Sequence, residues 1–206
     1  MELKASQRDA LAELINIGYG RAAGALSELT GYRITLEVPQ VTVQTFDRIS
    51  ELLNEVIQSQ VASVDQSFSG PIAGRAYLIL DQKAALVLSQ LLMETFSITP
   101  ELDSNARETL TEVGNILLNA CLGVFGNLLH VQVASQVPRF RLVPVKGVLN
   151  PPQSELNTNE TYGLMVHTRF HVKTKDITGY LVIVLGIASL DRLLTELDAW
   201  ERRQLS

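Results

Sequence analysis

The chain contains an internal repeat, and this repeat limits its fold more than any other feature of the sequence. A shift of 99 positions places Leu11 on Leu110, Glu13 on Glu112 and Asn16 on Asn115. The same shift aligns Ile17 with Ile116, Gly24 with Gly123, Leu29 with Leu128, Val38 with Val137 and Pro39 with Pro138. The chain is therefore a tandem duplication, and we expect each half to form the same set of elements.

A second pair of matched segments shows that the two halves differ in length. The segment IAGRAYLIL (72–80) resembles ITGYLVIVL (177–185) at a shift of 105, which leaves about six extra residues in the second half. We expect these residues in the stretch 150–162, because it contains the proline, asparagine and serine residues that are typical of loops.

Apolar periodicity predicts a long helix, about three strands and a closing helix in each half. In the first half, the expected elements are a helix from about Ser6 to Gly31 with Asp9 as capping partner, strands near 33–46, 58–68 and 74–80, and a helix over 83–96. In the second half, they are a helix from Ser104 or Asn105 to about 130, strands near 132–145, 162–173 and 179–185, and a helix over 189–203.

No linker of low complexity separates the halves, so we expect their sheets to merge. The sequence thus predicts an α/β (α+β) fold in a single domain, 1–206, made of two repeats (about 1–100 and 101–206). In this fold a mainly antiparallel sheet with approximate two-fold symmetry is flanked by the two long helices.

Each long helix separates into an apolar and a polar side when its residues are placed at about 100° per residue. The inner side of the first helix is predicted to carry Leu11, Leu14, Ile15, Gly18, Ala22, Ala25, Leu26 and Leu29, and its outer side Asp9, Glu13, Asn16, Gly20, Gly24 and Ser27. The inner side of the second is predicted to carry Leu110, Val113, Leu117, Cys121, Val124, Phe125 and Leu128, and its outer side Glu108, Glu112, Asn115, Asn119, Gly123 and Gly126. The duplicated Glu and Asn side chains are therefore expected to face solvent.

The outward residues predict a docking surface, because packing requires neither an exposed Glu nor an exposed Asn. Glycine inside a helix costs about 1 kcal/mol relative to alanine, so several glycines on one face indicate that a partner approaches the backbone. An Asn amide can hold a water molecule in line with an electrophile, and a Glu one turn away can pair with a cation. We identify Glu13, Asn16, Glu112 and Asn115 as candidate catalytic residues for phosphoryl transfer, whose loose transition state needs little covalent help.

Composition and charge exclude several other classes of function. A net charge of −5, a pI near 5.2 and the lack of a Lys/Arg cluster argue against nucleic acid as a partner. A single cysteine, Cys121, excludes an intramolecular disulfide and suits a reducing compartment. The N-terminus has no apolar signal core, and the longest apolar stretch, 181–190, is shorter than the roughly 20 residues that cross a bilayer. We expect a soluble cytoplasmic protein without membrane insertion.

Three further features favour structural interpretations. His167 and His171 have the spacing of a helical metal pair, but they fall on a predicted strand, where such positions lie about 13 Å apart and cannot share an ion. Cys121 falls in the apolar stripe, which favours a buried thiol over a nucleophile. The glycosylation acceptor pattern at 159–161 is a chance match in a cytoplasmic protein.

The repeated motif resembles that of the CheC, CheX and FliY phosphatases of bacterial and archaeal chemotaxis. Their pattern is Asp or Ser, three residues, Glu, two residues, Asn, then 22 residues and Pro. It is matched by Asp9, Glu13, Asn16 and Pro39, and again by Glu112, Asn115 and Pro138. INIGYGRAA and EVGNILLNA are similar to the active helices of the family, and the resemblance covers nearly the whole chain.

The two copies depart from the family pattern in different ways. Glu108 stands where the family shows Ser or Asp, and it adds negative charge one turn before Glu112. Ile15 and Arg21 stand where Gly and a small polar residue are usual. We therefore expect the two sites to differ in activity.

The resemblance implies a CheC-like fold and a phosphatase that acts on the aspartyl phosphate of a CheY-type response regulator. Asn16 and Asn115 would each orient the attacking water, and Glu13 and Glu112 would each pair with the active-site lysine of the regulator. It implies no cofactor bound by this chain, with magnesium held in the partner regulator. It also implies a second partner, the receptor deamidase CheD. Because one chain carries two sites, we expect a monomer.

Two alternatives to a phosphatase stay open. One is an adaptor that binds CheD or a phosphorylated regulator and has little turnover. The other is a structural part of the flagellar switch, which is disfavoured because no rotor-type domain is expected after the repeat.

Overall fold

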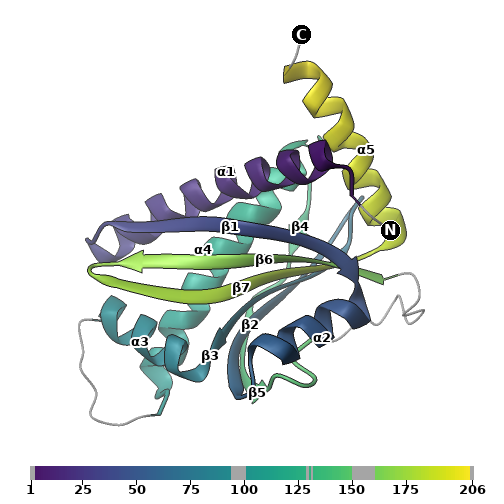
Figure 1. Ribbon diagram of the computed structural model, residues 1–206. Helices are drawn as coiled ribbons and strands as arrows, with labels where there is room; N and C mark the ends of the chain where they lie inside the picture. The colour runs from purple at the N-terminus through teal and green to yellow at the C-terminus, as the bar shows by residue number, and fades with distance from the viewer. Residues whose placement is uncertain (1–2, 94–100, 129, 131, 150–160, 205–206) are drawn as a thin grey trace.

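The structure is a computed structural model that describes residues 3–93, 101–128, 130, 132–149 and 161–204. Its elements are α1 (Ala5–Thr30), β1 (Ile34–Thr45), α2 (Phe46–Val56), β2 (Gln60–Ser69), β3 (Gly74–Asp81), α3 (Gln82–Met93), α4 (Ser104–Leu128), β4 (Ala134–Ser135), β5 (Arg139–Pro144), β6 (Thr161–Val172), β7 (Lys175–Gly186) and α5 (Ile187–Gln204). The strands form one antiparallel sheet with the long helices α1 and α4 on one face and the short α2 on the other (Figure 1). The predicted fold class is confirmed.

The order of the strands has the symmetry of the repeat. The sheet runs β1-β6-β7-β3-β2, and both β4 and β5 pair with the outer side of β2. Starting from the two edges, β1-β6-β7 corresponds to β5-β2-β3, and the halves meet where β7 pairs with β3. Each half supplies the edge strand of the other, since β1 pairs with β6 and β5 pairs with β2.

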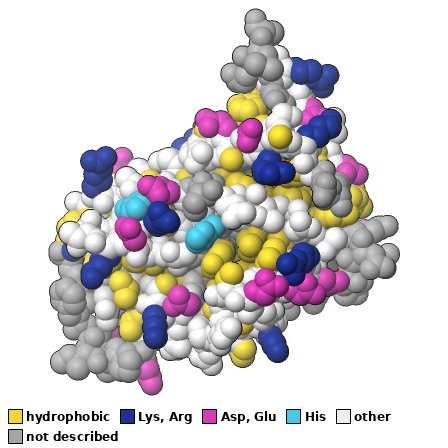
Figure 2. Space-filling view, viewed as in Figure 1, with side chains coloured by type: hydrophobic (Ala, Val, Ile, Leu, Met, Phe, Trp, Pro, Cys, Tyr) yellow, Lys and Arg dark blue, Asp and Glu magenta, His cyan; other side chains and the backbone are white. Residues whose placement is uncertain are grey.

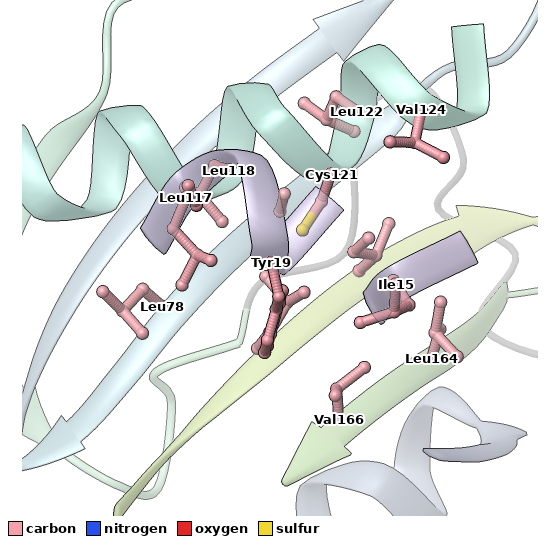
Figure 3. Packing of buried hydrophobic residues seen from close by; sticks show 14 of the residues in the cluster. Ile15, Tyr19, Leu78, Leu117, Leu118, Cys121, Leu122, Val124, Leu164 and Val166 are labelled. Atoms are coloured by element: carbon pink, nitrogen blue, oxygen red, sulfur yellow. The ribbon is translucent and has the colours of Figure 1, made fainter. Parts of the chain in front are cut away.

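The main apolar core lies between one face of the sheet and the helices that cover it, α1, α3, α4 and α5. Figure 3 shows Ile15 and Tyr19 of α1 and Leu117 and Cys121 of α4 gathered above the strands that carry Leu78, Leu164 and Val166. Cys121 is 1% exposed, as predicted, and burial raises the pKa of its thiol. A smaller cluster lies beneath α2 and includes Ile49, Leu53, Tyr77 and Ile79.

Helix α4 packs closely on α1 and on β2. A Cβ on Gly18 would lie 3.2 Å from the Cα of Cys121, so α1 and α4 approach closely at that point. A Cβ on Gly114 would lie 2.4 Å from Cγ1 of Val64, so the backbone of α4 rests directly on β2. Helix α4 is also the one described helix that is long and apolar enough to cross a membrane, but 56% of that window is buried within the protein. Its apolar surface therefore serves the core.

The structure corrects several predicted boundaries. Helix α2 was not predicted, although Phe46, Ile49 and Leu53 are buried at helical spacing. The strand predicted over 132–145 is interrupted, and only β4 and β5 pair with β2. Pro138, which has no backbone N–H to donate to a ladder, lies in the gap between them.

The caps of the long helices also differ from the prediction. Helix α1 begins at Ala5, where the Oε1 of Gln7 accepts the N–H of Lys4 at 3.1 Å, so Ser6 and Asp9 are inside the helix. Helix α4 is capped by Asp103, whose Oδ1 accepts the N–H of Ala106 at 2.8 Å.

Most of the extra residues of the second half lie in the β6–β7 hairpin. In the first half Gln66 pairs with Ala76, and the equivalent pair in the second half is Val166 with Leu181. The offset between equivalent residues is therefore 100 on the first strand of the hairpin and 105 on its second strand. No turn signal marks this extension, because the turn contains no glycine and Lys173 itself adopts a positive φ of 57°. The stretch 150–160 lies outside the described residues, as do the first two positions of the 159–161 acceptor pattern.

The extended hairpin is joined to β1 by charged side chains. His171 lies between Asp176 and Glu37, with 3.0 Å between its Nε2 and Oε1 of Glu37, and its interactions with the two carboxylates, Asp176 first, raise the pKa of this imidazole. His167 stacks on Tyr180, and burial together with Arg169 lowers its pKa. Both histidines lie on a strand, as predicted. Figure 2 shows acidic and basic side chains interspersed over this side of the molecule, without a large field of one sign.

Candidate functional site

The first candidate site lies on the outer side of α1. Glu13 and Asn16 are both exposed, as predicted, and their neighbours Leu14 and Ile15 are buried. Among the described residues, neither Glu13 nor Asn16 has a side-chain hydrogen-bond partner. This pair therefore presents a carboxylate and an amide to solvent with nothing to hold either in place.

The inner side of α1 differs in part from the predicted stripe. Tyr19 is 1% exposed and its hydroxyl is hydrogen-bonded to that of Thr168, whereas Ala25 is exposed and Leu29 is 60% exposed. The buried stripe runs through Leu11, Ile15, Tyr19, Ala22 and Leu26, so positions 25 and 29 fall to its side.

The second candidate site lies on α4 and is held by a chain of side-chain amides. Glu112 is exposed and Asn115 is half-buried. Asn115 donates through Nδ2 to Oε2 of Glu112 at 3.5 Å, and it accepts on Oδ1 from Nδ2 of Asn119 at 2.7 Å. Asn119 in turn accepts on Oδ1 from Nε2 of Gln66 at 2.9 Å. Gln66 belongs to β2 and is 2% exposed, so the chain of amides ties Asn115 to the sheet.

The first site lacks this chain of amides. The repeat places Gly20 at the position of Asn119, and the strand registers place Val166 at the position of Gln66. The two sites thus share the Glu–Asn pair and differ in its support. Sequence reasoning placed Asn119 on the outer side, where its spacing of four from Asn115 could have indicated a contact. Gln66 could not have been found, because only the sheet brings it to α4.

Of the small residues predicted on the outer sides of α1 and α4, some are open to solvent and others are buried or hydrogen-bonded. A Cβ on Gly20, Gly24 or Gly123 would meet nothing within 4 Å, so no contact inside the described chain requires glycine there. Gly126 is buried, contrary to prediction. Ser27 is also no docking residue, because its Oγ donates to the carbonyl of Ala23 at 2.6 Å and accepts the N–H of Ile34 at 3.0 Å. We define the glycine faces as Gly20 and Gly24 on α1, and Gly123 on α4.

A groove of about 610 Å³ lies beside the second site. It is lined by residues of α4 and of the β2–β4 edge: Ser69, Gly70, Asn119, Leu122, Gly123, Gly126, Asn127, Gln132, Val133, Ala134 and Ser135. In the first half, Ser27 ties the first residue of β1 to α1. Gly126, at the equivalent position in α4, has no side chain to do this.

The donors at each site limit the chemistry it can perform. Each pair offers one carboxylate and one amide oxygen, which is fewer than the six or more oxygen ligands that a hard divalent cation prefers. Neither pair contains a nucleophile beside a base. The arrangement is suited to orienting a water molecule and pairing with a cation on a partner.

Comparison with known proteins finds relatives that are similar in sequence. The model of the CheC-like family matches residues 7–43, which include Glu13, Asn16 and Pro39. The chain is 24% identical over 202 residues to the CheY-P phosphatase CheC of Bacillus subtilis (strain 168), covering 96% of each protein. It is 23% identical over 170 residues to the flagellar motor switch phosphatase FliY of the same organism, covering 80% of this chain and 44% of FliY.

Solved structures share the fold at low sequence identity. The crystal structure of Thermotoga maritima FliY has a TM-score of 0.77 and 18% identity, and the match covers 97% of this chain and 99% of that one. The FliM middle domain from H. pylori has a TM-score of 0.67 and 13% identity, covering 94% and 99%. The chain thus shares its fold with FliY and the FliM middle domain, is similar in sequence to CheC and FliY, and matches the CheC-like family over the helix and strand that carry the first motif.

Proposed function

We propose that this protein is a phosphatase that hydrolyses the aspartyl phosphate of a CheY-type response regulator. The proposal rests on one observation above all: the Glu–Asn pair occurs twice, each time on the outer side of a long helix that also carries at least one exposed glycine that no internal contact requires. Relatives named CheY-P phosphatase and motor switch phosphatase support the choice of substrate.

In the proposed reaction, Asn16 or Asn115 holds a water molecule in line with the phosphorus atom of the regulator. The amide oxygen accepts a hydrogen bond from the water, and the amide nitrogen is left to donate to the phosphoryl group. Glu13 or Glu112 pairs with the active-site lysine of the regulator and so fixes the docked orientation. A magnesium ion held by the regulator would supply charge neutralisation at the phosphoryl group, so this chain would need no metal ligands of its own.

The proposal is tested by following the decay of a phosphorylated CheY-type regulator. We expect the wild-type protein to accelerate decay and the double variant Asn16→Ala/Asn115→Ala to be inactive, because both sites then lack the amide that positions water. Asn105→Ala is the matched control, since it removes an exposed Asn from α4 outside the pair. Decay that is equally fast with the double variant would refute the role given to the two amides.

The glycine faces lead to a separate prediction about docking. Gly20→Ala and Gly123→Ala should each stabilise the protein by up to about 1 kcal/mol, because alanine favours the helix and meets no neighbour. Combined in one chain, they should raise the KM for the phosphorylated regulator about 5-fold or more, since a methyl group forced into a packed interface costs about 1–3 kcal/mol. Thermal unfolding and decay kinetics measure the two effects. An unchanged KM would show that no partner approaches these glycines.

A binding role with little turnover is the second candidate. It is favoured by the fold shared with the FliM middle domain, for which a FliG–FliM complex from H. pylori has a TM-score of 0.67 to this chain. On this proposal the partner would be CheD or a phosphorylated regulator. Binding of the regulator without any acceleration of decay would favour it. We further propose that the protein acts in the cytoplasm as a monomer, because one chain carries both sites.

A further inference from the structure

The amides of the second site can point in only one direction. The carboxylate of Glu112 only accepts hydrogen bonds, so Asn115 must turn Nδ2 toward it and Oδ1 toward Asn119. Asn119 must then offer Nδ2 to Asn115, which leaves its own Oδ1 to accept from Gln66. Reversing the amides would place Oδ1 of Asn115 against the carboxylate. The charge of Glu112 therefore favours this orientation of the three amides over the reversed one.

Burial of Gln66 fixes the far end of this chain of amides. Its side chain is 2% exposed on β2, and its Oε1 has no hydrogen-bond partner among the described residues. Within the described part of the chain, its side chain makes one hydrogen bond, from Nε2 to Oδ1 of Asn119. A buried, half-satisfied amide is costly, and an apolar side chain of the same size would avoid that cost. Its contact with Asn119 thus points to a role that apolar packing cannot fulfil.

We propose that Asn119, anchored by Gln66, is a positioning residue for Asn115. This inference rests on the proposed function and adds residues that the Glu–Asn motif does not contain. Asn119 holds the amide of Asn115 in the orientation needed at the moment of attack, with one N–H and one lone pair of Oδ1 left for water and phosphoryl group. The first site has Gly20 and Val166 at these positions, so Asn16 must be ordered when the regulator docks.

The test uses a chain in which only the second site works, Asn16→Ala. In that background, Asn119→Ala should lower kcat about 2- to 12-fold, since fixing a free side chain costs about 0.5–1.5 kcal/mol, while KM changes less than 2-fold. Asn119→Asp retains the size of the side chain but offers only acceptors, so it should reverse the amide of Asn115 and lower kcat at least as much.

Gln66→Leu separates positioning from folding. It removes the unsatisfied Oε1 from the sheet, so the protein should be at least as stable as its parent. It should nevertheless lower kcat, because Asn119 loses its anchor. A slower enzyme that unfolds at the same or a higher temperature cannot be explained by loss of structure.

A readout without activity completes the test. In the parent, NMR should show the side-chain amide protons of Asn115 shifted and slow to exchange with water; in Asn119→Ala, they should move toward values of a free asparagine. An unchanged kcat in Asn119→Ala, or a rise in KM alone, would overturn the positioning role. If Asn115→Ala also leaves activity unchanged, the proposed function has failed instead, and the NMR result then decides the contact by itself.

Discussion

Replacing Asn115 with alanine is expected to remove more of the phosphatase activity than replacing Asn16. Both substitutions delete an amide that positions water, but Asn115 is already held by Asn119 and Glu112, whereas Asn16 is free. Ordering a free side chain costs about 0.5–1.5 kcal/mol, so the second site should turn over about 2 to 12 times faster than the first. Identical sites would each contribute half.

The expected residual activities follow from that ratio. Asn115→Ala should retain between about a third and about a tenth of the wild-type rate, and Asn16→Ala between about two-thirds and about nine-tenths. Initial rates of regulator dephosphorylation, with the regulator well above KM, measure both. If the first site contributes as much of the dephosphorylation rate as the second, or more, the amides of α4 do not accelerate turnover.

Gly114→Ala is expected to destabilise the protein strongly, although it adds only a methyl group to a helix. The new Cβ would lie 2.4 Å from Cγ1 and 2.6 Å from Cβ of Val64, so α4 or β2 must move. Overpacking of this kind costs about 1–3 kcal/mol. For a protein of this size the midpoint of thermal unfolding should fall by about 2–12 °C.

Two further variants show whether Val64 is the cause. In the double variant Gly114→Ala/Val64→Ala, the space left by Val64 should accept the new methyl group. Gly114→Ala should therefore lower the stability much less in the Val64→Ala background than in the wild-type protein. Gly123→Ala on the same helix is the matched control, because its Cβ meets nothing within 4 Å and should raise stability. Additive losses in the double variant would mean that Gly114 matters for a reason other than this contact.

The sequence predicted the long helices and the outward position of the Glu–Asn pairs because both depend on local periodicity. Leu11, Ile15 and Leu26 repeat at helical spacing, and that phase alone turns Glu13 and Asn16 to solvent. Helix α2 has the same kind of pattern in Phe46, Ile49 and Leu53, so local periodicity also contains the signal for this helix.

The support of the second site could not be predicted, because it depends on contacts between distant parts of the chain. Gln66 and Asn119 are 53 positions apart, and only the packing of α4 on β2 brings them together. The close approach of Gly114 to Val64 has the same origin. In the other half, Ile15 occupies the position of Gly114, and nothing in a single sequence shows which of the two helices lies nearer the sheet.

The exchange of edge strands between the halves has a consequence for how the chain folds. Among the described strands, β1 (Ile34–Thr45) pairs with β6 (Thr161–Val172) alone. During synthesis its edge therefore stays unpaired until most of the second half has left the ribosome, although α1 and the β2–β3 hairpin can form early. Pairings this distant in sequence slow folding and expose strand edges to aggregation in the meantime. A duplicated architecture that places both sites in one chain thus makes its first half dependent on its second.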